Sequence, residues 1–173
     1  MEVIGDLLKM LLPAALVIYA MYLTVKSILS KDLEKSVLDN KIERTRIVLP
    51  LQLQAHERIS LFLERISPHN LLVRLSDGKI NAKTFQQMLV MEIREEFQHN
   101  YSQQVYIGED TWKLIRQTVE ETIALINTSA EKLGSDARSI DLAREVFAEL
   151  ERRNGDPVQK ALSALKTEVR ELF

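Results

Sequence analysis

The feature that most constrains this sequence is a run of 16 uncharged residues near its start, residues 10–25. As an α-helix rising about 1.5 Å per residue, the run extends about 24 Å, and the hydrocarbon layer of a bilayer is about 30 Å thick. Apolar neighbours on both sides lengthen the run, and the flanking Lys9 and Lys26 can carry their ammonium groups to the interface. The sequence therefore predicts a transmembrane helix within residues 1–29.

Two alternatives to an uncleaved anchor fit this segment less well. A cleaved signal peptide begins with basic residues and ends at a small-residue cleavage site, but here Glu2 and Asp6 come first and the run is followed by Lys-Ser-Ile-Leu-Ser-Lys. A buried helix of a soluble protein would be a long central helix at the extreme N-terminus. We therefore expect the segment to remain as an anchor.

The distribution of basic residues predicts the orientation of this anchor. Lys9 is the only basic side chain before the run. Six follow within about 20 residues of its end: Lys26, Lys31, Lys35, Lys41, Arg44 and Arg46. The positive-inside rule places the basic side in the cytoplasm. We expect a single span in the inner (cytoplasmic) membrane, with the N-terminus outside and the soluble part in the cytoplasm.

Residues 30–49 are dense in charge and have little apolar support, which is typical of a solvated helical stalk. Pro50 then marks a new start, because proline suits the first turn of a helix and disrupts its interior. The sequence thus divides into an anchor (1–29), a stalk (30–49) and a cytosolic body (50–173).

The body carries helical periodicity and no strand-like alternation longer than four residues. The whole chain has only five Gly and four Pro, which disfavours turn-rich β folds. Helices are expected over 50–67, from Asn81 to about 104, over 112–133, around 140–153, and from an N-terminal signal at Asp156-Pro157 onward. Residues 71–75 could be helical or extended. The predicted fold class is all-α: a transmembrane helix, a charged helical stalk and a cytosolic bundle of about five helices.

The clearest pattern in the chain is an apolar seam on the helix predicted for 112–133. Its members recur at steps of three and four: Trp112, Ile115, Val119, Ile123, Ile126, Ala130 and Leu133. At 100° per residue they lie within about 80° of one another, which is the narrow stripe of a coiled coil. We expect this seam to carry an interaction, either with the helix that begins at Asn81 or with a second chain.

Two segments resemble a known family. They are residues 51–68 (LQLQAHERISLFLERISP) and residues 92–107 (EIREEFQHNYSQQVYI). The chain resembles an uncharacterised family of small, single-pass membrane-anchored helical proteins of the Bacteroidetes type, over residues 10–133. This resemblance implies an anchor followed by a helical bundle. It implies no activity, so no catalytic residue follows from it.

Composition excludes several kinds of chemistry. Without cysteine, the chain has no disulfide, thiolate nucleophile or Cys-ligated metal. The five glycines are too far apart for a phosphate-binding loop, and neither a nucleophile elbow nor a zinc-protease motif is present. A net charge of −2 disfavours nucleic-acid binding. We predict no catalytic residue, no cofactor and no nucleic-acid partner.

One constellation favours a metal site as an alternative. Glu96 and His99 have the Glu-x-x-His spacing by which helical bundles hold di-iron or di-manganese centres, and Glu92 lies on the same face. Such sites need a second Glu-x-x-His helix, which this chain lacks unless a symmetric dimer supplies it. The preferred hypothesis is a non-enzymatic, membrane-tethered helical interaction module, a scaffold or complex subunit that binds a protein partner or a second copy. The alternative is a metal-binding helical bundle.

Overall fold

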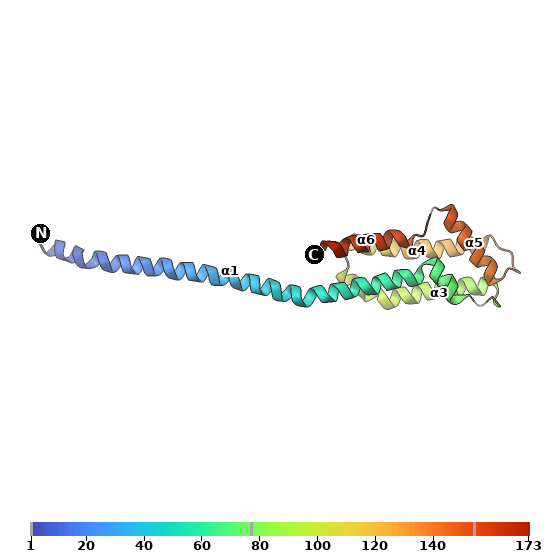
Figure 1. The fold of residues 1–173 in the computed structure, drawn as a ribbon, viewed down its shortest axis with the longest axis horizontal. Coiled ribbons are helices and arrows are strands. Elements are labelled where there is room, and N and C mark those ends of the chain that lie inside the picture. Colours follow the sequence, from blue (N-terminus) through green and yellow to red (C-terminus); the bar gives the residue numbers. More distant parts are fainter. Residues whose placement is uncertain (1, 77, 154) are drawn as a thin grey trace. The chain divides into compact units, whose positions relative to one another are not determined.

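The computed structural model describes the backbone of residues 2–76, 78–153 and 155–173, without the side chains of 2–15, 28, 30–41 and 44 (Figure 1). The elements are α1 (Glu2–Ile66), α2 (Pro68–Leu75), α3 (Ala82–Asn100), the 3-10 helix η1 (Tyr101–Tyr106), α4 (Glu109–Glu131), α5 (Ser139–Arg152) and α6 (Val158–Glu171). The described residues contain no strand, only one isolated bridge between Asn81 and Arg138. The prediction of an all-helical chain is therefore confirmed.

The chain divides into two units, residues 1–48 and 49–173. The side chains described in the first unit are exposed, including all of those from 16 to 27. No helix in the described part of the chain is long and apolar enough to cross a membrane. The predicted transmembrane helix is thus not supported: its described uncharged stretch is only 16–25, and the side chains of 10–15 and of most of the stalk lie outside the described residues.

Pro50 does not begin a helix, so that expectation was wrong. Helix α1 is continuous from Glu2 to Ile66 and passes through Pro50. Proline there removes one backbone donor, which leaves the carbonyl of Arg46 without its usual helical partner. Arg46 and Pro50 are both exposed, so water can replace the lost hydrogen bond.

The core of the second unit forms around α4. This helix packs against α3, α5 and α6, and Figure 1 shows α3 and α6 running alongside it. The C-terminal part of α1 adds one apolar face to the same core. Its fully buried members are Ile59, Phe62, Leu63 and Ile66. The period of 3.6 residues that predicted these helices also decides which side of each one is buried.

Local signals place most of the helix ends. The side chain of Asn81 accepts a hydrogen bond from the amide of Thr84 at 2.7 Å, which confirms the predicted N-cap of α3. At the start of α6 the N-cap is Pro157, one residue later than expected, and the carboxylate of Asp156 accepts a hydrogen bond from the amide of Val158 at 2.9 Å. Pro68 begins α2, so residues 71–75 are helical. Helix α3 ends four residues earlier than expected, because the chain tightens into η1 at Tyr101.

Candidate functional site

The predicted seam lies inside the second unit. Five of its residues are at most 8% exposed: Trp112, Ile115, Val119, Ile123 and Ile126. Ala130 and Leu133 are partly buried and pack against the same core. The chain's own helices therefore cover most of the seam, and α3, which begins after Asn81, is one of the helices that α4 contacts.

Helix α4 also carries a second buried stripe. It consists of Thr118, Thr122, Leu125 and Ser129, each at most 2% exposed. Three of these residues carry hydroxyls, so a search for apolar periodicity overlooks them. The hydroxyl of Thr122 donates to the carbonyl of Thr118 at 2.8 Å, so it is buried without losing its hydrogen bond. With both stripes buried, α4 is a central helix rather than one that meets a single partner.

Trp112 belongs to a cluster of aromatic rings at the break between α3 and α4. Its indole stacks on Phe97, with ring centroids 5.8 Å apart and planes at 20°. The ring of Tyr101 stands edge-on to both of them. The ring of Phe62 in α1 also packs near Phe97, with ring centroids 6.0 Å apart. These ring contacts help to fix the turn through η1, and they leave Trp112 only 8% exposed.

The two glutamates of the predicted metal set, Glu92 and Glu96, pair with arginines rather than approaching His99. Glu96 pairs with Arg65 at 2.7 Å, and Glu92 pairs with Arg74 at 2.5 Å. His99 is exposed, and its Nδ1 lies 3.0 Å from the carbonyl of Glu95. The described residues contain no group of three or more His, Asp or Glu placed to hold a metal ion. The predicted alternative set of Glu92, Glu96 and His99 thus gains no support.

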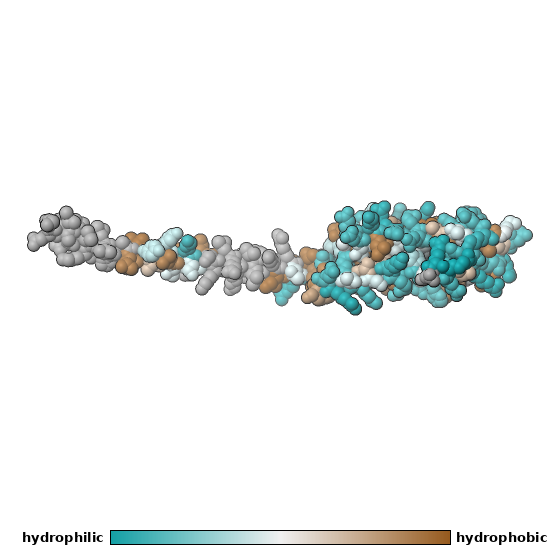
Figure 2. Space-filling model, turned by 90° about the horizontal axis from the view of Figure 1, so that it is seen from above, coloured by the Kyte–Doolittle hydropathy of each residue, from teal (hydrophilic) through white to brown (hydrophobic). Residues whose placement is uncertain are grey.

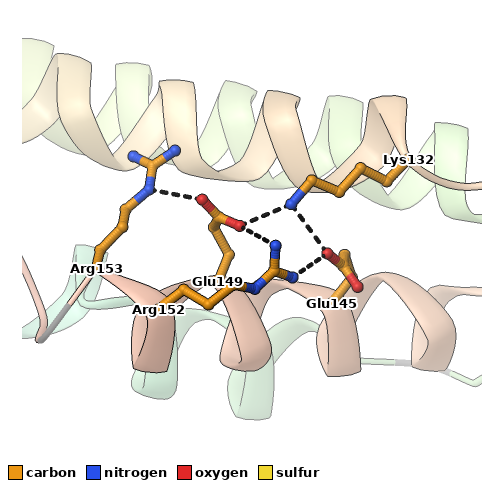
Figure 3. Close-up of polar contacts among 5 residues, drawn as sticks. All are labelled: Lys132, Glu145, Glu149, Arg152 and Arg153. Atoms are coloured by element: carbon orange, nitrogen blue, oxygen red, sulfur yellow. Dashed lines mark hydrogen bonds and ion pairs between the residues drawn. The ribbon is translucent and has the colours of Figure 1, made fainter.

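Figure 3 shows the densest polar cluster, which joins the end of α4 to α5. Lys132 lies 2.7 Å from Glu149 and 3.2 Å from Glu145. Arg152 bridges the same two carboxylates at 2.7 and 3.0 Å, and Arg153 adds a contact to Glu149 at 2.9 Å. The hydrogen bonds from Lys132 and Arg153 outweigh desolvation and lower the pKa of Glu149 to about 2. Each carboxylate has cationic partners, so the cluster fastens two helices.

A junction of three helices also escaped the sequence analysis. His56 of α1 is 3% exposed, and its Nε2 lies 3.1 Å from Oε1 of Glu168 in α6. The same oxygen accepts a hydrogen bond from the amide of Gly108, the N-cap of α4, at 2.7 Å. Burial tends to raise the pKa of Glu168, but hydrogen bonds from Thr111, Gly108 and His56 outweigh it and lower that pKa. No spacing in the sequence links residues 112 positions apart.

Gly108 makes this junction possible by its size. A Cβ at this position would lie 3.2–3.3 Å from the carboxyl group of Glu168, which is closer than side-chain carbons usually approach. A hydrogen atom in place of the Cβ lets the carboxylate reach the backbone amide. The negative charge then lies at the N-terminus of α4, where the helix dipole stabilises it.

The surface of the second unit is mostly polar, whereas the described part of the first mixes apolar and polar residues (Figure 2). A hollow of about 420 Å³ lies between α3 and α4. Val90 and Met91 provide its apolar part, and Met91 is 56% exposed. Lys83, Arg94 and Glu95 add two basic groups and one acidic group beside these apolar side chains.

The comparisons with known proteins assign this chain no activity. No curated protein and no solved structure matches this sequence. A family described as "Family of unknown function (DUF7935)" matches residues 2–172. This match is wider than the resemblance over 10–133, since it includes α5 and α6, and it bears neither on the anchor nor on a Bacteroidetes source. The chain belongs to the DUF7935 family of unknown function.

Proposed function

We propose that this protein is a non-enzymatic, membrane-tethered interaction module. The N-terminal part of α1 anchors it as a single span with the N-terminus outside. The helical unit 49–173 lies at the cytoplasmic face of the inner membrane and binds a protein partner as a scaffold or complex subunit.

The observation that carries the anchor is the exposure of residues 16–25. The large apolar side chains of this stretch are between 47% and 69% exposed. Leu16, Val17, Ile18 and Tyr19 follow one another at 100° steps, so apolar surface faces every side of the helix. A partner helix would cover one side only, whereas a bilayer surrounds all of them.

The uncharged sequence continues from 16 back to residue 10, and Lys26 ends it at the other side. Tyr19 and Tyr22 precede Lys26 at a spacing that suits an interfacial aromatic belt. The excess of basic residues after Lys26 supports a cytoplasmic location for the second unit. These sequence features and the exposed apolar surface all favour a membrane anchor.

We propose a binding rather than a catalytic role because of the contacts that the carboxylates make and because of the residues that line the exposed hollow. The buried or clustered carboxylates Glu149 and Glu168 contact the chain's own cations and amides. The exposed hollow beside Met91 is lined by apolar, amide and charged side chains, with Lys83, Arg94 and Glu95 as the charged ones, and it has no nucleophile–base pair among its lining residues. We propose that the partner protein binds this hollow, because the chain's own helices already cover most of the seam on α4.

Membrane extraction tests the anchor. The full chain should remain in the membrane pellet after washing with alkaline carbonate. Val17→Asp should shift it toward the soluble fraction, because a carboxylate in the centre of a span costs about 3 kcal/mol. Val73→Asp is a matched control, since Val17 and Val73 are 66% and 67% exposed. Release of the unmodified chain by carbonate would contradict the anchor.

Reporter fusions test the orientation. A C-terminal reporter that works only in the cytoplasm should be active, and one that works only after export should be inactive. The reverse pattern would place the second unit on the other side of the membrane.

Cross-linking in native membranes tests the binding surface. Met91→Glu should abolish the cross-linked partner band, because it places a charge in the apolar part of the hollow. Leu61→Glu is the control, since Leu61 is also 56% exposed but lies on α1. Equal bands from both variants would show that the hollow is not the binding surface.

A further inference from the structure

Both ring nitrogens of the buried His56 face oxygen acceptors. Nδ1 lies 2.7 Å from the carbonyl oxygen of Gln52, and Nε2 lies 3.1 Å from Oε1 of Glu168. A backbone carbonyl can only accept, and so can an ionised carboxylate. A neutral imidazole has one N–H and would leave its other nitrogen lone pair facing an oxygen. Hydrogen bonds from both ring nitrogens to these oxygens require the imidazolium form of His56, which carries a proton on each nitrogen.

A protonated Glu168 donating to a neutral ring would satisfy the same distances, but its surroundings favour the carboxylate. Oε1 already accepts the amide of Gly108 at 2.7 Å. The N-terminus of α4 adds a positive field at the same place. Oε2 is buried without a hydrogen-bond partner of good geometry among the described residues, so it carries no proton that is donated elsewhere. The shared proton therefore belongs on the ring.

The charged groups around the pair also favour a cationic ring. The ring contacts the carboxylate of Glu168 from α6 and the carbonyl of Gln52 from α1. Helix α4 contributes the amide of Gly108 and the hydroxyl of Thr111 to the carboxylate. Glu168 also lines a surface hollow whose other titratable groups are acidic: Glu109, Asp110 and Glu171. This acidic setting stabilises the positive charge.

We propose that His56 and Glu168 form a proton-dependent latch that fastens the C-terminal helix α6 to α1 and to the start of α4. With the ring protonated, one carboxylate oxygen joins all three helices. Loss of the ring proton as the pH rises leaves a nitrogen lone pair facing an acceptor and a partly buried carboxylate without its cation, so α6 loosens. Protonation of Glu168 in acid breaks the same latch. The device is independent of the membrane anchor, because its residues all lie in the second unit.

The protonation state can be observed directly in the full chain in detergent. Only three histidines are present, so selective ¹⁵N-histidine labelling gives three ring systems. At neutral pH both ring nitrogens of His56 should show attached protons. Glu168→Gln should remove one of these protons, while the spectrum of the exposed His99 stays unchanged. A single-tautomer neutral His56 in the unmodified chain would overturn the proposal.

Hydrogen exchange tests the release of α6. Between neutral and mildly alkaline pH, protection factors of α6 amides, corrected for intrinsic rates, should fall by about tenfold or more relative to those of α3. Glu168→Gln should make the α6 factors lower and independent of pH. The matched variant His99→Gln should keep the pH-dependent loss of the unmodified chain. The same pH profile in the unmodified chain and Glu168→Gln would refute the latch. The ring spectrum of the unmodified chain decides the question even if a variant fails to fold.

Discussion

Residues 16–25 of α1 and helix α4 are both helical and both rich in large apolar side chains, yet their surroundings are opposite. In 16–25 the apolar side chains point in every direction and are exposed. In α4 they share one broad face with small hydroxyl residues, and the other helices of the second unit cover that face. Apolar content alone therefore does not decide burial. The spacing of apolar residues decides whether a helix can be covered by neighbours of its own chain.

The strongest test of this contrast is a charge placed in each segment. Ile123→Asp should unfold the second unit, because Ile123 is 6% exposed and an unpaired buried carboxylate costs about 4 kcal/mol or more. Ile18→Asp should leave the melting of that unit unchanged, because Ile18 is 69% exposed. Circular dichroism during thermal unfolding measures both. A stable Ile123→Asp would show that the seam is not part of the core.

A smaller effect separates the two sides of α3. Leu89→Ala should lower the free energy of unfolding by about 3 kcal/mol, because Leu89 is fully buried and its loss leaves a cavity. Met91→Ala should change it by less than about 0.5 kcal/mol, because Met91 lies on the exposed side. Chemical denaturation of the two variants gives the comparison. Equal losses would mean that α3 is buried on both sides.

Two glycines sharpen the contrast between a crowded and an open position. Gly108→Ala should destabilise the second unit by about 1 kcal/mol, because the new methyl group presses on the Glu168 carboxyl and alanine is a poor N-cap. Gly134→Ala should be neutral or stabilising by up to about 1 kcal/mol, since nothing lies within 4 Å of its added Cβ. Thermal unfolding of both variants distinguishes them. A Gly108→Ala as stable as the unmodified chain would argue against the close approach of Glu168.

The smallest effect concerns the ionic cluster of Figure 3. The pKa of Glu149 is lowered from 4.5 to about 2, so its stabilising contribution is present above about pH 4.5 and is lost as the pH falls toward 2. Carboxyl ¹³C shifts should show this midpoint. Lys132→Met should raise it, because the largest stabilising hydrogen bond is removed. The control variant Lys160→Met, which changes a lysine in α6, should leave the midpoint of Glu149 unchanged. A midpoint near 4.5 in the unmodified chain would contradict the cluster geometry.

The positions of most helices could be predicted from the sequence, because the signals that form and end a helix are local. The apolar period of α4, the N-cap at Asn81 and the carboxylate of Asp156 just before α6 each act within one or two turns of helix. The error at Pro50 has a similarly local cause. The preference of proline for a helix start is strong, but an exposed helix can continue past it when water satisfies the freed carbonyl.

The candidate site was less predictable because its residues are far apart in the chain. The spacing of Glu96 and His99 pointed to a metal, but Arg65 of α1 binds Glu96 and changes its role. The junction of His56 and Glu168 has no signal in spacing at all. Such pairs form only when helices that are distant in sequence are packed together, and their charges are then fixed by the local contacts.

By itself, the sequence determined that this chain is helical, where most helices begin and end, and that residues 10–25 are uncharged over a length unusual in a soluble helix. These properties follow from backbone hydrogen bonding and side-chain period, which are short-range. Only the tertiary structure decided that both stripes of α4 are buried, that Glu96 pairs with Arg65, and that His56 meets Glu168 at the start of α4. Packing decides these contacts, because burial and charge pairing depend on which helices come together.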